Sequence, residues 1–484
     1  MTKFPYLRQD FLASIVVFLV AVPLCVGVAV ASGVPAELGL ITGIVGGLLT
    51  GFMRGSSLQV SGPAAGLTVL VFEAVSEFGV ATLGVIVLMA GLLQLAMGFL
   101  GIGRWFRAIS VSVVEGMLCG IGLVIIAGQI YAAAGLKAPK TGIGKLAGLP
   151  GAFADALGST QALASLAIGA GTIAVIVLWK KLPKAVQSVP GALAAVILAT
   201  VAAVVLLPVA TVEVEGLLGV IQVPGADAFG DLATPAIWGT IVAFTLIASA
   251  ESLFSAAAVD RLHDGPRTQY NKEMIAQGAG NTVCGLLGAL PMTAVIVRSS
   301  ANVNAGAKTK ASRVLHGVWL LLFAAAMPWA LALIPIPALA GILVHAGWKL
   351  IPFRQITELW RSHKGESLIL VVTAVSIVAV NMFEGVLIGL ALSVVKTAWE
   401  ASHLKTEVID KGAGPIQVYL SGNATFLRLP KILDSLEALP HDRPIELDLS
   451  GLHHLDHACR TALENWAQRH SAPDTEPVKI TANT

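Results

Sequence analysis

Long apolar runs recur along this chain and restrict its fold more than any other feature. Twelve of them reach or approach the roughly 20 residues that a helix needs to cross a bilayer. They lie near 11–31, 36–53, 82–101, 110–130, 161–179, 189–208, 236–258, 273–290, 314–333, 337–350, 367–380 and 384–398. The first run is too long for the apolar region of a signal peptide. The sequence therefore predicts an all-α polytopic membrane protein embedded in the lipid bilayer.

Composition agrees with this prediction and excludes several classes of protein. Only 12% of the 484 residues are charged, against about 25% in soluble domains. The net charge of +2 indicates no polyanionic partner, so we expect no nucleic-acid binding. The four cysteines lie far apart, and the apolar runs contain no metal motif and no nucleophile beside a base. We therefore expect neither an enzyme nor a bound metal or cofactor.

The charges that do occur are unevenly distributed. Residues 401–484 hold 19 of the 60 charged side chains and six of the ten histidines. This predicts a transmembrane domain over residues 1–400 and a small domain of soluble composition over residues 413–484. Most loop lysines and arginines fall on the side of Arg8, whereas loop 209–235 has four carboxylates and no Lys or Arg. Both termini should thus be cytoplasmic, in the plasma membrane.

One loop breaks this charge pattern. Lys137, Lys140 and Lys145 all lie in a segment that the predicted topology places outside. Four carboxamide or carboxylate residues in or near the spans are assigned packing, interfacial or outer-end positions: Glu73, Glu77, Glu115 and Gln129.

Two segments, 63–79 and 293–304, are too short or too polar to cross as ordinary helices. Each has a proline at or just before its start, and each is third in its half of the chain, so about 14 segments form a predicted seven-plus-seven inverted repeat. A helix that begins in mid-membrane has unpaired N–H groups and a partial positive charge at its start. Two such starts that face each other predict an anion site. The alternative is a pair of proline-kinked ordinary spans.

Two charged residues at membrane depth are further candidates. Arg298 needs a polar cavity or a partner there, so it either adds positive charge to the anion site or pairs with a carboxylate such as Glu251. Glu251 must be protonated, paired or bound to a cation, and Ser255 lies one turn further along the same helix face. The two residues could hold Na⁺, or Glu251 could carry a proton. The alternative for Glu251 is a structural salt bridge to Arg298.

Several blocks of the sequence resemble the SulP family, the sulfate-permease group related to solute carrier family 26. They are Val22-Pro23, the stretch from Ala31 to Leu40, Gly91-Leu92-Leu93-Gln94, and the stretch from Asn271 through Asn281 and Pro291 to Lys308. The resemblance implies core and gate domains, and transport of anions such as bicarbonate, sulfate or dicarboxylates by an elevator-like motion. It also implies a substrate site formed by Ala64, Ala65, Gly66 and Thr68 on one side and by Ala294, Val295, Ile296, Val297 and Arg298 on the other. Glu251 and Ser255 match the coupling-ion ligands of sodium-coupled bicarbonate members.

Two departures from the family pattern bear on the substrate. Leu24 stands where many sulfate transporters have glutamine, and Ile296 stands where the sodium-coupled bicarbonate type has a hydroxyl residue. The expected function is therefore secondary transport of a small inorganic anion, with bicarbonate first, coupled to Na⁺ or H⁺. Sulfate or dicarboxylate transport on the same fold, a nucleobase permease and an anion channel are the alternatives.

The tail resembles a shortened STAS domain, which implies regulation and a homodimer. Strands are predicted at 416–420 and 445–450, and helices at 432–439 and 456–469. The turn Asp456-His457-Ala458-Cys459 lacks the serine that many STAS domains phosphorylate. Crowding of His453, His454, His457 and Cys459 allows a metal site, although solvated or turn histidines are the favoured interpretation.

Overall fold

The computed structural model describes residues 6–108, 110–183, 186–205, 209–412, 414–440, 443–470 and 477–481. The end of the predicted run 189–208, and residues 413, 441–442, 471–476 and 482–484 of the predicted tail domain, lie outside the described residues. The chain divides into two compact units, Met1–Gly389 and Leu390–Thr484.

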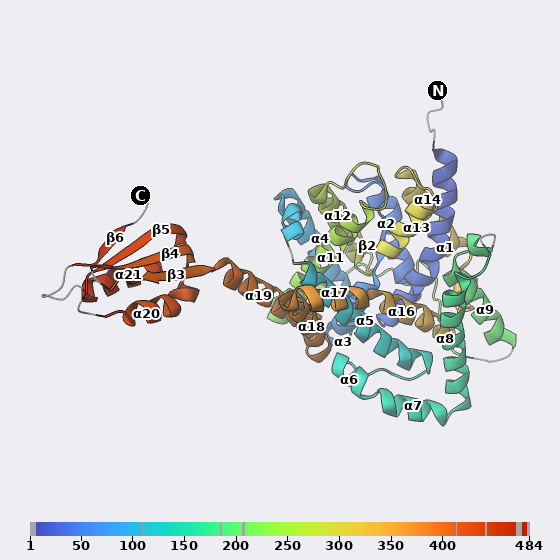
Figure 1. Cartoon of the computed structure of the whole chain (residues 1–484). Coiled ribbons are helices and arrows are strands. Elements are labelled where there is room, and N and C mark those ends of the chain that lie inside the picture. Colours follow the sequence, from blue (N-terminus) through green and yellow to red (C-terminus); the bar gives the residue numbers. More distant parts are fainter. Residues whose placement is uncertain are drawn as a thin grey trace. The chain divides into compact units, whose positions relative to one another are not determined.

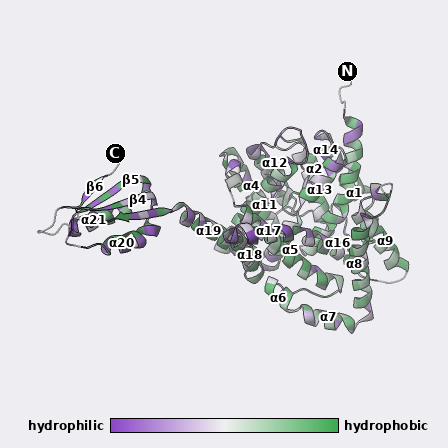
Figure 2. Cartoon of the chain, viewed as in Figure 1, coloured by the Kyte–Doolittle hydropathy of each residue, from purple (hydrophilic) through white to green (hydrophobic). Residues whose placement is uncertain are grey.

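Helices occupy all the apolar runs of the first unit, which confirms the predominantly helical fold (Figure 1). Figure 2 shows hydrophobic residues along most of them. The main helices are α1 (Leu7–Ala31), α2 (Ala36–Phe52), α4 (Val80–Phe99), α5 (Val111–Ala133), α8 (Thr160–Trp179), α9 (Gly191–Val205), α11 (Pro235–Val259), α12 (Tyr270–Leu286), α14 (Ala311–Ala326), α16 (Ile336–Leu350), α18 (Lys364–Ala379) and α19 (Met382–Ala401).

Seven helical stretches in the described part are long and apolar enough to cross a membrane. They are α1, α4, α5, α8, α11, α19 and the stretch 336–362, in which α16 is followed by α17 (Phe353–Ser362). The helices α2, α9 and α14 are apolar but shorter. The total of fourteen segments stays a prediction.

The two interrupted segments form a matched pair. Strand β1 (Ser61–Pro63) pairs antiparallel with strand β2 (Met292–Ala294), with Gly62 opposite Thr293. A single 3₁₀ turn, η1 (Ala65–Leu67), and helix α3 (Thr68–Phe78) follow β1, whereas α13 (Ile296–Asn304) follows β2. At 1.5 Å per residue, α3 and α13 extend only about 16 and 14 Å, roughly half of the hydrocarbon thickness. Because the strands are antiparallel, the chain leaves them in opposite directions.

Small residues bring the neighbouring helices close to this pair. A side chain at Gly91 of α4 would collide with the backbone of Thr282 in α12, and one at Gly285 of α12 would collide with the backbone of Leu88 in α4. Where no solvent drives helices together, such close backbone contact supplies the packing energy. The α4–α12 pair is thereby a rigid support for β2, which follows α12 directly.

The second unit contains a four-stranded sheet in the order β3-β4-β5-β6. Its strands are β3 (Leu404–Ile409), β4 (Ile416–Ala424), β5 (Ile445–Leu455) and β6 (Lys479–Thr481), with helices α20 (Leu429–Glu437) and α21 (His457–His470). Strands β4 and β5 pair in parallel, so the predicted strand–helix alternation is confirmed, while β3 and β6 were not predicted. Apolar residues from both central strands and both helices form its core, for example Val418, Leu447 and Trp466.

The tail histidines and Cys459 do not gather into one cluster. Cys459 is fully buried in this core, whereas His453, His454 and His457 are exposed. Asp456 accepts hydrogen bonds from the N–H groups of Cys459 (2.8 Å) and Phe426 (2.6 Å), so it caps α21. The Asp456 carboxylate therefore has a structural role in this turn, which lacks the serine that many STAS domains phosphorylate.

Candidate anion-binding site

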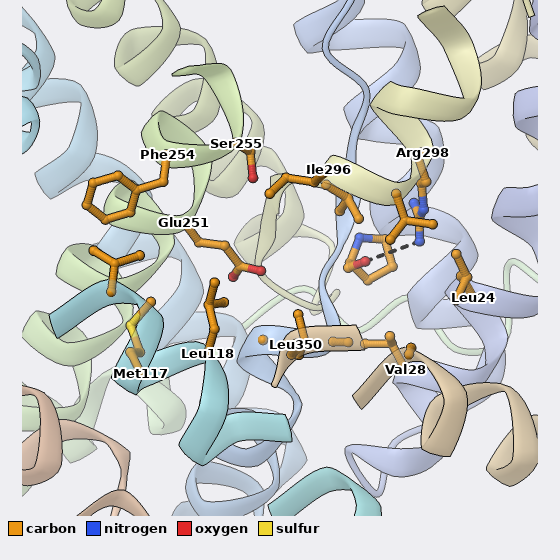
Figure 3. Close-up of a pocket in the computed structure, with 17 residues that line it drawn as sticks. Leu24, Val28, Met117, Leu118, Glu251, Phe254, Ser255, Ile296, Arg298 and Leu350 are labelled. Atoms are coloured by element: carbon orange, nitrogen blue, oxygen red, sulfur yellow. Dashed lines mark hydrogen bonds between the residues drawn. The ribbon is translucent and has the colours of Figure 1, made fainter. Parts of the chain in front are cut away.

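A cavity of about 100 Å³ lies where the two half-helices begin (Figure 3). It receives residues from α1, α5, α11 and α16 as well as from the segments around β1 and α13. Its lining consists of Leu24, Val28, Pro63, Ala65, Gly66, Val114, Met117, Leu118, Glu251, Phe254, Ser255, Val295, Ile296, Val297, Arg298, Ala346 and Leu350. Most of this wall is apolar, so the few polar groups in it determine what it can bind.

The start of α13 presents backbone donors at the cavity. The first hydrogen bond of this helix runs from the Ser299 N–H to the Val295 carbonyl (3.0 Å). The N–H groups of residues 296–298 precede that bond, and the helix itself does not use them. Their partial positive charge adds to that of the helix dipole. A negatively charged ligand is therefore favoured at this end of α13.

Arg298 supplies the full positive charge of the site. It is completely buried, and its Nη2 donates to the Pro63 carbonyl at 3.1 Å. Within the described part of the chain, its Nε and Nη1 have no hydrogen-bond partner. The guanidinium reaches this position because Gly62 has no side chain; a Cβ there would collide with Nη1. Two donors of a buried cation thus have no hydrogen-bond partner in the described part of the fold.

A second buried arginine shows what a structural role looks like in this protein. Arg313 of α14 donates five hydrogen bonds, all to backbone carbonyls near the end of α2 and the start of the broken segment. The accepting carbonyls belong to Thr50, Gly51, Met53 and Gln59. Arg313 does not line the cavity. The contrast shows that the fold uses the donors of Arg313 more fully than those of Arg298.

Glu251 and Ser255 of α11 also reach the cavity, as Figure 3 shows. The Oε2 atom of Glu251 is buried and has no partner among the described residues. Its other oxygen lies close to the start of the first broken helix: a Cβ at Gly66 would stand 2.6 Å from Oε1. No ion pair joins Glu251 to Arg298 in the described structure, so the structural salt bridge considered above is not formed.

The predicted substrate residues fall into two groups. Six of them line the cavity, namely Ala65, Gly66, Val295, Ile296, Val297 and Arg298. Ala64, Thr68 and Ala294 do not. Ala294 belongs to β2 and pairs with Ser61, and Thr68 lines a different cavity. Ligand contacts of all these residues stay predictions.

Sequence reasoning missed the polar side chains that hold the strand pair in place. Ser252 of α11 accepts a hydrogen bond from the Ala294 N–H (3.2 Å). Ser299 of α13 accepts one from the Val60 N–H (2.9 Å). Asn281 of α12 bonds both the N–H and the carbonyl of Met292 and donates to the Gln94 amide oxygen (2.7 Å). Gln94 and Asn281 stood in the blocks that carried the resemblance, and their positions amid apolar runs were the available signal.

The apolar wall was missed as well, since apolar residues are too common in this chain to mark a site. Val114, Met117 and Leu118 come from α5, and Ala346 and Leu350 come from α16.

Known proteins share both the sequence and the fold. The profile of the sulfate permease family matches residues 7–373. The putative sulfate transporter YvdB of Bacillus subtilis is 27% identical, over 96% of this chain and 89% of that protein. The bicarbonate transporter BicA of Picosynechococcus is 24% identical over 96% and 86% of the two chains.

Solved structures match at the level of the fold. The transmembrane domain of a cyanobacterial bicarbonate transporter BicA covers 81% of this chain and 98% of its own, with a TM-score of 0.68 and 23% identity. The inward-facing murine Slc26a9 anion transporter covers 100% and 86%, with a TM-score of 0.78 and 17% identity. With a family profile that matches most of its length, this chain belongs to the sulfate permease family of membrane anion transporters.

Proposed function

We propose that this protein carries out secondary active transport of bicarbonate. The observation that carries this assignment is the charge of the cavity: Arg298 is the only lysine or arginine among the residues that line it. One guanidinium matches one monovalent anion once the coupling ion neutralises the Glu251 carboxylate in the same wall. Sulfate or a dicarboxylate would bring a second negative charge into a mostly apolar wall, where an uncompensated charge is strongly unfavourable.

Leu24 supports the same choice. It lines the cavity at the starts of the two half-helices. According to the family resemblance, many sulfate transporters have glutamine at this position. Among the described residues, the cavity wall therefore has no amide side chain that could hold a sulfate oxygen. Sulfate remains the second candidate because YvdB, one of the relatives, is described as a putative sulfate transporter.

Glu251 is the proposed coupling residue. Its unpaired carboxylate oxygen at the cavity could bind Na⁺ together with the Ser255 hydroxyl, or accept H⁺ directly. Ile296 offers no oxygen ligand, so a Na⁺ site would depend on Glu251, Ser255 and backbone carbonyls. Na⁺ in this scheme is a transported ion rather than a resident cofactor.

An uptake panel in proteoliposomes tests the substrate. Labelled bicarbonate, sulfate and fumarate are offered separately, with and without an inward Na⁺ gradient and with and without a pH gradient. Concentrative bicarbonate uptake that collapses with one of the gradients is expected. Uptake that only equilibrates the anion would support a channel instead, and sulfate uptake without bicarbonate uptake would overturn the substrate assignment.

The Glu251→Gln variant tests the coupling. Because the amide cannot lose or gain the charge that Na⁺ or H⁺ compensates, uptake should no longer respond to the driving gradient. Ser362→Ala, a change in the exposed helix α17, is the control and should keep wild-type coupling. Undiminished gradient dependence in Glu251→Gln would assign coupling to another residue.

The remaining features of the proposal concern the whole molecule. We propose an elevator-like movement of a core that carries α3 and α13, a location in the plasma membrane, and cytoplasmic termini. The tail is proposed to be a STAS-like regulatory domain that contributes to a homodimer. Chemical cross-linking of the full chain in membranes, compared with a chain that ends at Ala401, tests the dimer. Equal dimer yields from both chains would exclude a contribution of the tail.

A further inference from the structure

Lys145 is a buried lysine in the one external loop that broke the loop-charge pattern. Lys137 and Lys140 are exposed, whereas Lys145 retains only 6% of its exposed surface. It lies in α6 (Gly142–Ala147). The Tyr131 hydroxyl of α5 donates to the Lys145 carbonyl at 2.9 Å and so fixes the backbone of α6. The ammonium is therefore held inside the protein by the local fold.

This buried ammonium lacks the partner that burial normally requires. Within the described residues, it forms no ion pair and no hydrogen bond. It lies 4.9 Å from the centroid of the Phe72 ring of α3, in a cation–π contact. The carboxylate that acts on it electrostatically is Glu73, which together with Glu77 lines a separate cavity. Lys145 thus carries a charge that the fold does not fully compensate.

Two further polar side chains without partners meet Lys145 at a cavity of about 200 Å³. Thr68 is 4% exposed, and its hydroxyl has no hydrogen-bond partner among the described residues. Gln129 of α5 is 8% exposed, and its amide forms no hydrogen bond within the same part of the chain. The remaining wall is mainly apolar and includes Val30, Val69, Val124 and Leu136. The volume is well above the roughly 30 Å³ of one water molecule.

We propose that this cavity is a second anion site, on the outer side of the transport site. The ammonium of Lys145 supplies the charge, and the Gln129 amide and the Thr68 hydroxyl supply neutral donors. A small inorganic anion, such as bicarbonate, sulfate or chloride, would satisfy all three groups. A cation would be repelled by Lys145, and a neutral solute would leave its charge uncompensated.

The position of Thr68 gives the site its place along the transport path. Thr68 begins α3, two residues after Gly66, and both Ala65 and Gly66 line the first cavity. The two cavities therefore lie on either side of the same helix start. An anion that arrives from outside would meet Lys145 before it meets Arg298. This inference rests on the anion-transport function of the family and does not depend on the choice of bicarbonate.

Kinetics measured separately in the two directions test the proposal. Full-length Lys145→Met is reconstituted in one orientation, and the KM for influx and for efflux is measured with labelled bicarbonate and, separately, with labelled sulfate. For the anion that is carried, loss of one charge-assisted contact should raise the influx KM about tenfold and leave the efflux KM unchanged. Lys140→Met removes an exposed lysine of the same loop and should change neither value.

The rival interpretation is that the contact between Lys145 and Phe72 only holds α6 against α3 and binds no anion. In that case Lys145→Met should change kcat equally in both directions and leave the influx KM unchanged. This result would overturn the proposal of an anion site. Gln129→Leu decides the matter if Lys145→Met is unstable: a smaller rise in influx KM supports the site, and an unchanged KM refutes it.

Charge rescue adds a test that a structural role would not pass. Lys145→Cys should show the raised influx KM, and modification with aminoethyl methanethiosulfonate, which restores an ammonium, should lower it again. Failure of the modified protein to recover would contradict an electrostatic role. Because the same anion is compared in all variants, failure of these tests is distinguishable from failure of the bicarbonate assignment.

Discussion

Replacement of Arg298 by methionine gives the most direct test of the transport site. The side chain is fully buried, with one donor bonded to the Pro63 carbonyl and two donors without partners in the described structure. A hydrogen bond to a charged group contributes about 1.5–3 kcal/mol. Loss of one such bond to the anion should therefore weaken binding roughly ten- to a hundredfold.

The fold should tolerate this change, because methionine removes a buried charge instead of leaving one unpaired. Arg313→Met is the matched control. It removes five hydrogen bonds to four backbone carbonyls, of which that of Met53 also accepts one from Lys310, so it should destabilise the protein by about 3 kcal/mol or more while leaving the cavity lining intact. Replacement of Arg298 should thus affect anion binding, whereas replacement of Arg313 should affect stability.

Two measurements on detergent-purified full-length protein distinguish these effects. Titration calorimetry gives the Kd of the anion that the uptake panel identifies, and the unfolding midpoint gives stability. Arg298→Lys should bind with intermediate affinity, since it keeps the charge but not the planar fork of donors. A wild-type Kd for Arg298→Met would refute the assignment of Arg298 to the anion site.

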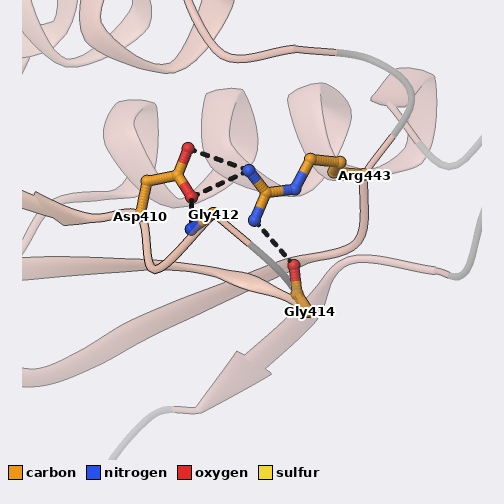
Figure 4. A network of polar contacts seen from close by, with 4 residues as sticks. All are labelled: Asp410, Gly412, Gly414 and Arg443. Atoms are coloured by element: carbon orange, nitrogen blue, oxygen red, sulfur yellow. Dashed lines mark hydrogen bonds and ion pairs between the residues drawn. The ribbon is translucent and has the colours of Figure 1, made fainter.

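Three further predictions follow from other parts of the structure. Gly66→Ala places a methyl group 2.6 Å from the Glu251 carboxylate, which costs about 1–3 kcal/mol through overpacking. The variant should therefore reduce gradient-driven uptake about tenfold or more. Gly171→Ala, in open space on α8, is the control and should not reduce uptake. Truncation of the chain after Ala401 removes the whole tail sheet and should leave the Kd for the anion within about twofold of the wild-type value. A truncated protein that is stable but does not bind the anion would contradict the division into two units. The Gly412 N–H and the Arg443 guanidinium hold the pKa of the Asp410 carboxyl below its ordinary value (Figure 4), so the stability from this contact is present at neutral pH and is lost as pH falls through the folded-state pKa. The fall in tail stability on acidification, followed by hydrogen exchange of the Gly412 N–H, should be smaller in Asp410→Asn.

The sequence was sufficient to predict the broken helices because their signals are local. Proline followed by small and then polar residues at membrane depth is rare enough to indicate α3 and α13, and Arg298 stands out in an apolar context. The direction in which each side chain points could not be predicted in the same way. Successive residues of a helix point about 100° apart, and a helix that is apolar on all sides has no polar face to orient it. Thr68 therefore lines the cavity beside Lys145 rather than the predicted one.

Lys145 illustrates the same limit for a charged residue. In the sequence it is one of three lysines in a loop predicted to be external, and nothing local separates it from Lys137 and Lys140. Its burial arises because α6 folds back onto α5, where Tyr131 fixes the Lys145 carbonyl. Only this tertiary contact turns an exception to the loop-charge pattern into a candidate binding group.

Several buried charges of this protein are satisfied by the fold. Asp10 accepts bonds from Lys308 and Thr309, Asp260 accepts them from Thr268, and Arg313 is saturated by carbonyls. These groups join segments of the chain and leave nothing free for a ligand. Arg298 and Glu251 differ from them, since each keeps a polar atom without a hydrogen-bond partner among the described residues. The ammonium of Lys145 forms no ion pair in the same part of the chain, and all three residues line a cavity. A buried charge that the protein leaves unsatisfied is unfavourable in the empty state, and an anion or its coupling ion is the species that would remove this penalty. The distribution of unsatisfied charge, rather than of charge itself, therefore marks the path we propose for the anion.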